Sequence, residues 1–306
     1  ELRTSARLQT IPTYIFAEIG RRARALAAEG TDVVRLDIGS PDLTPAPEVI
    51  ETLIKAVKRP DSHGYPSFYG MPDFRRAVAD YYVRRFDVAL DPEMEVLGLI
   101  GSKEGIYHVA TAFVDPDNVV LVPDPSYPAY RVSATLAGGE VYPLPLLREN
   151  GFLPDFAAVP HDILTRARVL WLNYPNNPTG AVASMDFLNE VVAFARTYHL
   201  LLAYDNPYSE ITWDGTEGCS VLQVKGARDV AIEFNSLSKT ANMAGWRIGM
   251  AVGNAQAITA LARVKTNADT GAFKPLQEAA SVALALPASW IEARNAVYQR
   301  RREVVT

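Results

Sequence analysis

From about residue 96 onward, short runs of apolar residues alternate with segments that have the apolar spacing of helices. Most runs are nearly uninterrupted Val, Leu and Ile, which is typical of strands buried on both faces. The pattern predicts strands over Val96–Ile100, Val119–Val122, Glu140–Leu146, Arg168–Asn173, Leu200–Tyr204, Val230–Phe234 and Ile248–Val252. It predicts intervening helices over Lys103–Phe113, Tyr127–Ala137, Met185–Tyr198 and Gln256–Lys265. This alternation favours an α/β fold, with a mostly parallel seven-stranded sheet and helices on both faces.

The first 72 residues have a different pattern. One apolar stripe predicts a helix from about Thr13 to Glu29, and Gly30 is placed to end it. A short strand is predicted next, over Val33–Ile38. Residues 60–72 are rich in Gly, Pro and Tyr, and we expect them to form a loop.

Beyond about residue 270 the strand pattern stops. Helices are predicted over Phe273–Leu286 and Ser289–Val305, and Ser289 is the expected N-cap of the second. That second helix has no Gly, Asn or Pro stop signal before Thr306. We therefore expect the helix to be cut before its natural end.

The composition of the chain argues against several classes of protein. The 306 residues are 48% hydrophobic and 21% charged, which argues against a disordered chain. The net charge of −5 makes a nucleic-acid partner unexpected, and no apolar run approaches the roughly 20 residues that a membrane span needs. The single cysteine, Cys219, fits a reducing compartment, so a cytoplasmic location is expected. Four histidines and this cysteine form no zinc pattern, and no metal site is expected.

Two polar segments follow predicted strands in a way that suggests binding. Gly101–Gly105 opens a helix, where small residues expose backbone N–H groups that suit a phosphate. A plain N-cap at Ser102 explains the same residues. The segment Asn173–Gly180 holds two prolines and three asparagines at a strand's carboxyl end. Tight-turn chemistry is its simpler explanation.

Two further strand ends carry ionisable groups. Asp205 directly follows a buried strand, where a bare carboxylate is costly, so it needs a cationic or hydrogen-bonding partner or caps the next turn. Lys239 follows Ser236 and Ser238, and Arg247 comes eight residues later. A partly desolvated lysine has a lowered pKa and can form an imine, although an isolated lysine in such a place is usually solvated.

Taken in order, these segments meet the demands of one cofactor. They offer phosphate donors, an imine-forming lysine, an acid placed for a cation, and Asn and Tyr side chains for a ring. Pyridoxal phosphate needs a Schiff-base lysine and an acidic partner for its pyridinium nitrogen. The sequence therefore predicts a pyridoxal-phosphate site.

The same motifs resemble those of the class I/II aminotransferases, which are fold type I pyridoxal-phosphate enzymes. The resemblance runs from about Tyr14 to the end of the chain. The segments that carry it are Tyr174–Gly180, Asp205–Tyr208, Ser236–Lys239 and Gly245–Gly249. It implies a transaminase that works by a ping-pong mechanism through a Lys239 Schiff base.

The resemblance also implies roles for individual residues. Lys239, Asp205 and Tyr208 would be catalytic, with Asp205 paired to the ring nitrogen, and Asn177 and Tyr208 bonded to the ring's phenolic oxygen. Tyr127 would stack on the ring. The phosphate would be held by Ser102, Lys103, Ser236, Ser238, Arg247 and, from the neighbouring subunit, Tyr69. Substrate contacts are expected from Tyr14, Gly39, Asn177 and Asn267.

Three strings look most like LL-diaminopimelate aminotransferases and their relatives: Pro12–Phe16, Gly101–Gly105 and Asn267–Gly271. This implies an LL-diaminopimelate, aspartate or alanine type of donor and 2-oxoglutarate as the expected acceptor. A homodimer with shared active sites is also implied.

The resemblance further implies a division into domains. Residues 1–44 would form an arm and the start of a small domain, 45–287 the large cofactor domain, and 288–306 the start of an interdomain helix. The rest of the small domain, with the arginine for the substrate carboxylate, is expected beyond Thr306.

Two other functions stay open at this point. A carbon–sulfur lyase of the same fold uses the same cofactor residues, so the motifs do not separate it from a transaminase. A non-catalytic sensor is less expected, because such regulators carry a basic DNA-binding segment upstream and this chain is acidic.

Overall fold

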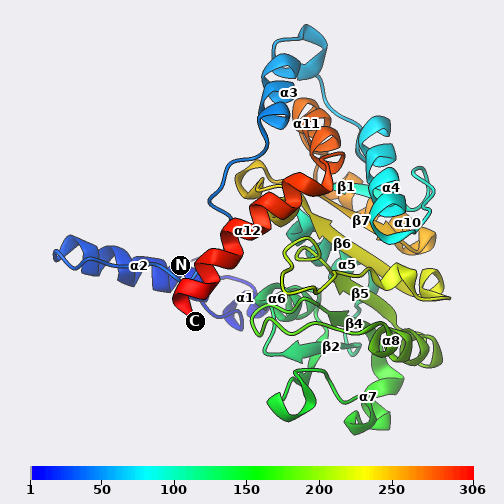
Figure 1. Cartoon of the computed structure of the whole chain (residues 1–306). Coiled ribbons are helices and arrows are strands. Elements are labelled where there is room, and N and C mark those ends of the chain that lie inside the picture. The colour runs from blue at the N-terminus through cyan, green and yellow to red at the C-terminus, as the bar shows by residue number, and fades with distance from the viewer. Residues whose placement is uncertain (1) are drawn as a thin grey trace.

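The computed structural model describes residues 2–306, in which seven strands form one sheet. The sheet lies at the centre of the molecule (Figure 1). The strand order is β1-β7-β6-β5-β4-β2-β3. The strands are β1 (Val96–Leu99), β2 (Val119–Asp124), β3 (Glu140–Pro145), β4 (Ala167–Leu172), β5 (Leu201–Asp205), β6 (Ala231–Ser236) and β7 (Gly249–Gly253). Strands β2 to β6 pair in parallel, whereas β7 runs antiparallel to both β1 and β6. The predicted α/β fold with a mostly parallel seven-stranded sheet is confirmed.

Helices cover both faces of the sheet, as expected. On one face lie α5 (Ser102–Phe113), α6 (Pro128–Ala137) and α10 (Ala255–Ala268), which bury Ile106, Tyr130 and Leu261 against the strands. The other face carries α4 (Pro72–Phe86), α8 (Met185–Thr197) and α11 (Lys274–Leu284), together with α3 (Pro47–Val57) and α7 (His161–Arg166). Because both faces are covered, the strands need apolar side chains on each side, which explains their uninterrupted Val and Leu runs.

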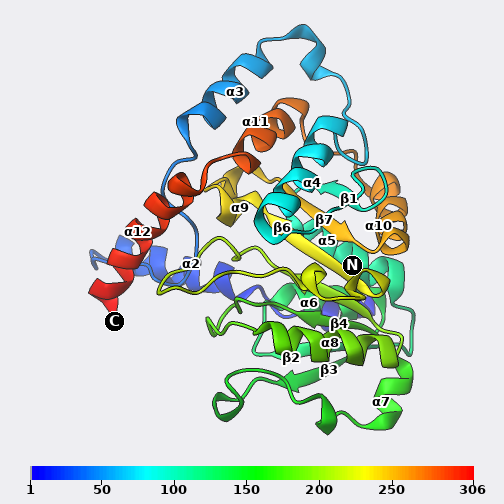
Figure 2. The same cartoon turned by 45° about the vertical axis from the view of Figure 1, so that its right-hand side comes forward.

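The remaining elements are short or lie at the ends of the chain. They are α1 (Ala6–Gln9), α2 (Ile15–Ala28), α9 (Leu237–Thr240), α12 (Ala288–Val305) and 3₁₀ turns at Pro60–His63, Arg148–Asn150, Phe156–Ala158, Val221–Gln223, Ala227–Asp229 and Ala244–Trp246. In both views α2 projects away from the sheet, and α12 runs from the end of α11 toward α2 (Figures 1 and 2). No helix within residues 2–306 has both the length and the apolar character needed to span a bilayer.

The strand predicted over Val33–Ile38 is wrong. This segment is not in any strand, and no other described segment pairs with its backbone. Val34 and Leu36 are each more than three-quarters exposed. The alternating apolar residues are present, but a strand also needs a partner for its N–H and C=O groups, and none of residues 2–306 supplies one.

Two long helices were not predicted, α3 and α4. Both begin with a proline, at Pro47 and Pro72, where the missing N–H costs nothing because the first turn has no partner for it. In α4 the buried residues Phe74, Val78 and Tyr82 recur at helical spacing. The loop predicted over 60–72 therefore ends where α4 begins.

The predicted N-cap of the last helix is wrong by two residues. Helix α12 begins at Ala288, and Pro287 takes the N-cap position expected for Ser289.

Candidate active site

A cavity of about 660 Å³ lies where β4, β5 and β6 end and α5 begins. Ligands in open α/β sheets bind beyond the carboxyl ends of parallel strands, so this position agrees with the fold. The cavity is lined by twelve of the predicted residues: Tyr14, Gly39, Ser102, Lys103, Tyr127, Asn177, Asp205, Tyr208, Ser236, Ser238, Lys239 and Arg247. Sequence segments separated by more than 200 residues thus meet at one place.

Asp205 is the last residue of β5, and its carboxyl group is buried. Oδ2 accepts a hydrogen bond of 2.6 Å from the hydroxyl of Tyr130. Oδ1 is also buried, and no group within residues 2–306 donates to it. Burial raises the pKa of Asp205 to about 7, and the Tyr130 hydrogen bond only partly offsets this rise. One oxygen of a buried carboxyl group is therefore available to a donor from the cavity.

Two loops beside Asp205 are tied together by amide side chains. Asn173, directly after β4, donates to the backbone oxygen of Asp205 across 2.7 Å and accepts from the backbone N–H of Asn177 at the same distance. Asn177 Nδ2 in turn donates to the hydroxyl of Tyr208 across 3.1 Å. Burial raises the pKa of Tyr208 to about 12, so its phenol keeps its proton near neutral pH.

Lys239 lies on the single helical turn α9, directly after β6. Its Nζ donates to the backbone oxygen of Gly39 and lies 6.0 Å from the centre of the Tyr208 ring. Desolvation lowers the pKa of Lys239, and the nearby charge of Arg247 lowers it further. Both effects favour the neutral amine, the form that attacks a carbonyl carbon.

A second group of lining residues offers hydroxyl and cationic partners that suit an anion. Ser102 begins α5, Ser236 caps α9 by accepting from the backbone N–H of Ser238, and Arg247 Nη1 lies 3.4 Å from Ser238 Oγ. Gly101 has φ +77°, and a Cβ there would lie 2.4 Å from Arg247 Nη2. Glycine therefore suits the left-handed backbone conformation, and a larger residue would displace the guanidinium group from its present position.

Lys103 also faces the cavity, between two aromatic rings. Its Nζ lies 4.9 Å from the centre of the Tyr14 ring and 5.8 Å from that of Tyr127. Burial lowers the pKa of Lys103, with a smaller contribution from Arg247. The Tyr127 ring meets Tyr130 edge-on, at 5.8 Å between centres.

Two predicted residues do not line the cavity. Asn267, on α10, is directed instead to its own helix, where Nδ2 donates to the backbone oxygen of Arg263. Tyr69 is nearly half exposed on the loop before α4. Its expected role concerns a second subunit, so the single chain leaves that role a prediction.

Two residues that contribute to the site were not predicted as site residues. Tyr130 holds Asp205, and Asn173 ties the two loops to each other. Tyr130 also stacks on Trp171 of β4 at 4.7 Å, so its ring belongs to the core while its hydroxyl reaches the site. In the sequence it is only one more aromatic residue near the start of a helix, and nothing local distinguishes it.

Glu104, His108 and Asp269 form the one group of metal-ligand type found in residues 2–306. The fully buried ammonium group of Lys265 lies 2.6 Å from Glu104 Oε1 and 2.5 Å from Asp269 Oδ1. A cation from α10 therefore already pairs with both carboxylates and offsets part of their charge. Glu104 Oε2 also accepts from the backbone N–H of Ile100, which connects this cluster to the residue that precedes Gly101–Gly105.

Comparisons with known proteins agree with this geometry. The family described as aminotransferase class I and II matches residues 31–306. The LL-diaminopimelate aminotransferase of Desulforudis audaxviator is 52% identical over 299 residues, covering 98% of this chain and 76% of the relative. That of Aquifex aeolicus is 49% identical over 302 residues, covering 99% and 78%.

A solved structure is similar as well. The substrate-bound structure of BacF from Bacillus subtilis superposes with a TM-score of 0.95 at 36% identity, covering 98% of this chain and 76% of that one. The matched residues include every segment that lines the cavity from residue 31 onward. On these grounds the chain belongs to the class I and II aminotransferase family.

Proposed function

We propose that this transaminase binds pyridoxal phosphate in the cavity and moves the amino group of LL-diaminopimelate to a 2-oxo acid, with 2-oxoglutarate as the acceptor. The proposal of this donor rests on the relatives at 49–52% identity, which carry that name. Three strings quoted from the sequence, including Gly101–Gly105, whose Ser102 and Lys103 line the cavity, point to the same subgroup.

The observation that carries the cofactor proposal is the buried Oδ1 of Asp205, which lacks a donor from residues 2–306. A protonated ring nitrogen would supply that donor and would bring a positive charge next to the carboxylate. The other chemical demands are also met. Lys239 offers an amine with a lowered pKa, and Arg247 with the serines around it offers cation and hydroxyl partners for a dianionic phosphate.

Pyridoxal phosphate, when bound, supplies an aldehyde carbon for amino groups and a ring that withdraws electrons from the substrate Cα. Around that chemistry, Asp205 would keep a proton on the ring nitrogen by charge pairing. Asn177 and Tyr208 would donate hydrogen bonds to the ring's oxygen, and the Tyr127 side chain would pack against the ring. Lys239 Nζ, which lines the same cavity, would take the proton from the substrate Cα and pass it to the cofactor, because the cavity holds the amine close to both.

We further propose that the active form is a homodimer in which Tyr69 contributes to the partner's phosphate site. Tyr65, Phe68 and Tyr69 form an exposed aromatic stretch, with exposed fractions of 87%, 44% and 45%. Exposed aromatic residues in such a run are typical of protein–protein contacts. The division into an arm, a large domain and the start of an interdomain helix, at residues 44 and 287, is part of the same proposal.

A donor–acceptor screen tests the substrate proposal. LL-diaminopimelate, aspartate and alanine are each offered with and without 2-oxoglutarate, and glutamate formation is measured. The proposal predicts the highest kcat/KM with LL-diaminopimelate and no turnover without the acceptor. Release of ammonia from a β-substituted amino acid in the absence of an acceptor would instead indicate a lyase. Lys239→Ala, which removes the reactive amine, is the control for background activity.

A further inference from the structure

One of the contacts between helix α12 and the rest of the molecule is made by a buried arginine, Arg294. Arg294 is the one buried residue of this helix, with an exposed fraction of 4%. A buried guanidinium group is costly unless its donors find partners. Here Nη1 donates to the backbone oxygens of Lys239 and Thr240, and Nη2 donates to that of Glu210 across 2.5 Å. Arg294 is therefore held by main-chain carbonyls from two separate segments.

The first of these segments is α9, the turn that carries Lys239. A helix of four residues leaves its last carbonyl oxygens without partners inside the helix. Arg294 Nη1 supplies donors to two of them, at 3.0 Å for the oxygen of Lys239. The backbone from which the Lys239 side chain extends is thus fixed from α12 and not only by β6.

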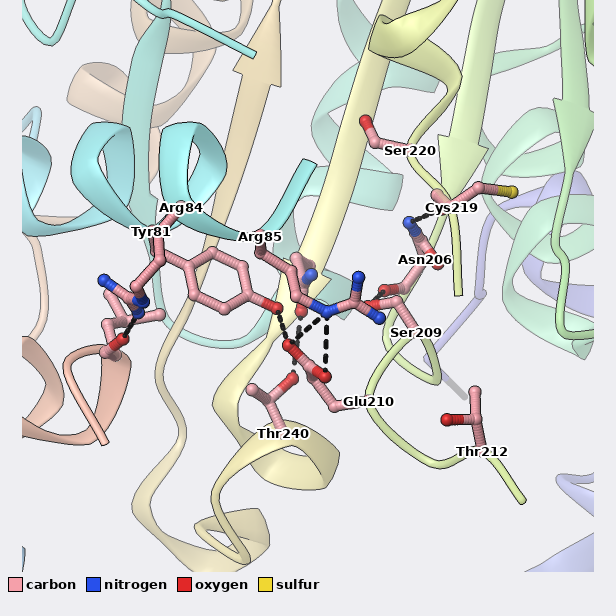
Figure 3. A network of polar contacts seen from close by, with 12 residues as sticks. Tyr81, Arg84, Arg85, Asn206, Ser209, Glu210, Thr212, Cys219, Ser220 and Thr240 are labelled. Carbon is pink, nitrogen blue, oxygen red and sulfur yellow. Dashed lines mark hydrogen bonds and ion pairs between the residues drawn. The ribbon is translucent and has the colours of Figure 1, made fainter. Parts of the chain in front are cut away.

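The second segment carries Tyr208. Glu210, two residues further on, is held from both sides: its backbone oxygen accepts from Arg294 and from Asn295 Nδ2, the latter across 2.9 Å. Its carboxylate accepts from Tyr81, across 2.8 Å, and from Arg85, both on α4 (Figure 3). The loop after β5 is therefore held between α4 and α12.

We propose that Arg294 is a positioning residue of the transamination reaction, which fixes the Lys239 turn and the Tyr208 loop relative to each other. This inference rests on the proposed function. The amine of Lys239 lies 6.0 Å from the centre of the Tyr208 ring, and this spacing depends on two segments that have Arg294 as a common hydrogen-bond donor. Without Arg294, the two segments lose their common donor, so that each can shift relative to the other and water gains access to the amine.

The test compares Arg294→Met and Arg294→Lys with Arg300→Met. Arg300 is an exposed arginine of the same helix for which residues 2–306 provide no ion pair, so its loss controls for helix composition. In cofactor-free protein, the rate at which Lys239 is acylated is measured against pH by peptide mapping. We expect Arg294→Met to raise the pKa of Lys239 toward its ordinary value, because desolvation of the amine is relieved.

Kinetic measurements provide the second readout. Arg294→Met should lower kcat by about tenfold or more and leave KM within about twofold, because the residue orients reacting groups and does not bind substrate. Arg300→Met should change neither. If Arg294→Met does not fold, Arg294→Lys keeps one charge with fewer donors and should give a smaller shift in the same direction. An unchanged acylation profile and an unchanged kcat in the folded variant would overturn the proposal. Because the acylation profile needs no substrate, it stays decisive even if the proposed donor is not turned over.

Discussion

The hydroxyl of Tyr130 donates to Oδ2 of Asp205 across 2.6 Å, and Oδ1 of the same carboxyl group has no donor from residues 2–306. This asymmetry orients the carboxyl group, because one oxygen is fixed by α6 and the other is left for a ligand. Burial raises the pKa of Asp205 to about 7, because the charged carboxylate is costly without solvent. A cation beside the carboxyl group would offset this cost and favour the charged form.

Replacing this carboxylate tests its role directly. Asp205→Asn preserves size but cannot hold a proton on a ring nitrogen by charge. The variant should still bind the cofactor, because the phosphate contacts are intact, but kcat should fall by about a hundredfold or more. Cofactor content by absorbance and steady-state kinetics measure both quantities. A variant that retains full kcat would remove Asp205 from the mechanism.

Asp205 and Glu233 should each make the cofactor-free protein less stable as pH rises. Burial raises the pKa of both Asp205 and Glu233 to about 7, whereas in the unfolded chain both groups lose their protons near pH 4. Between about pH 4 and pH 7 the folded state therefore binds more protons than the unfolded state, and these two groups make the free energy of unfolding decrease.

Asp205→Asn removes one of these two titrating groups. The difference in the free energy of unfolding between the variant and the unmodified protein then reports Asp205 alone, because all other titrating groups are common to both. Relative to the unmodified protein, the variant should gain roughly 1–3 kcal/mol in the free energy of unfolding between about pH 5 and about pH 8. Urea unfolding of both proteins at several pH values measures this gain. Two curves that stay parallel would contradict the raised pKa.

Removing the Tyr130 hydroxyl should weaken catalysis without opening the core. Tyr130→Phe keeps the stacking contact with Trp171 but leaves Oδ2 of Asp205 without its donor. Because that hydrogen bond lowers the pKa of Asp205, its loss should raise this pKa further, and kcat should fall by about tenfold. Tyr142→Phe, on strand β3, is the matched control and should be neutral. Equal kcat values for both variants would argue against the role given to Tyr130.

Gly101 should be needed for phosphate binding. Gly101→Ala places a Cβ in collision with Arg247 Nη2 and strains a backbone with φ +77°. Displacement of the guanidinium group should weaken cofactor affinity by about tenfold or more, which fluorescence titration of cofactor-free protein can measure. Gly151→Ala is the control, because Gly151 also has positive φ but open space around it, and it does not line the cavity. Comparable losses of affinity in both variants would indicate general backbone strain.

Much of the fold could be predicted from the sequence because each buried strand carries its own apolar run. The polar segments after β4, β5 and β6 could also be predicted as a site, because together they meet the chemical demands of pyridoxal phosphate. Asn177, Asp205 and Lys239 therefore line one cavity as expected.

Other features depend on contacts that no local pattern encodes. The segment 33–38 alternates like a strand, but pairing depends on a partner elsewhere. Arg294 occurs in a polar helix, where an arginine usually faces solvent, and its burial depends on three backbone carbonyl groups supplied by two distant segments. Tyr130 is similar, because its importance comes from the oxygen that its hydroxyl reaches.

The central claim is that Lys239 carries the cofactor, and reduction with borohydride tests it most directly. The cofactor-loaded protein is reduced, digested and mapped by mass spectrometry. The structure predicts that the cofactor mass is found on the peptide containing Lys239, because that amine has a lowered pKa and lies inside the cavity. Label on Lys103 or any other lysine, or no label in protein that holds the cofactor, would contradict the account.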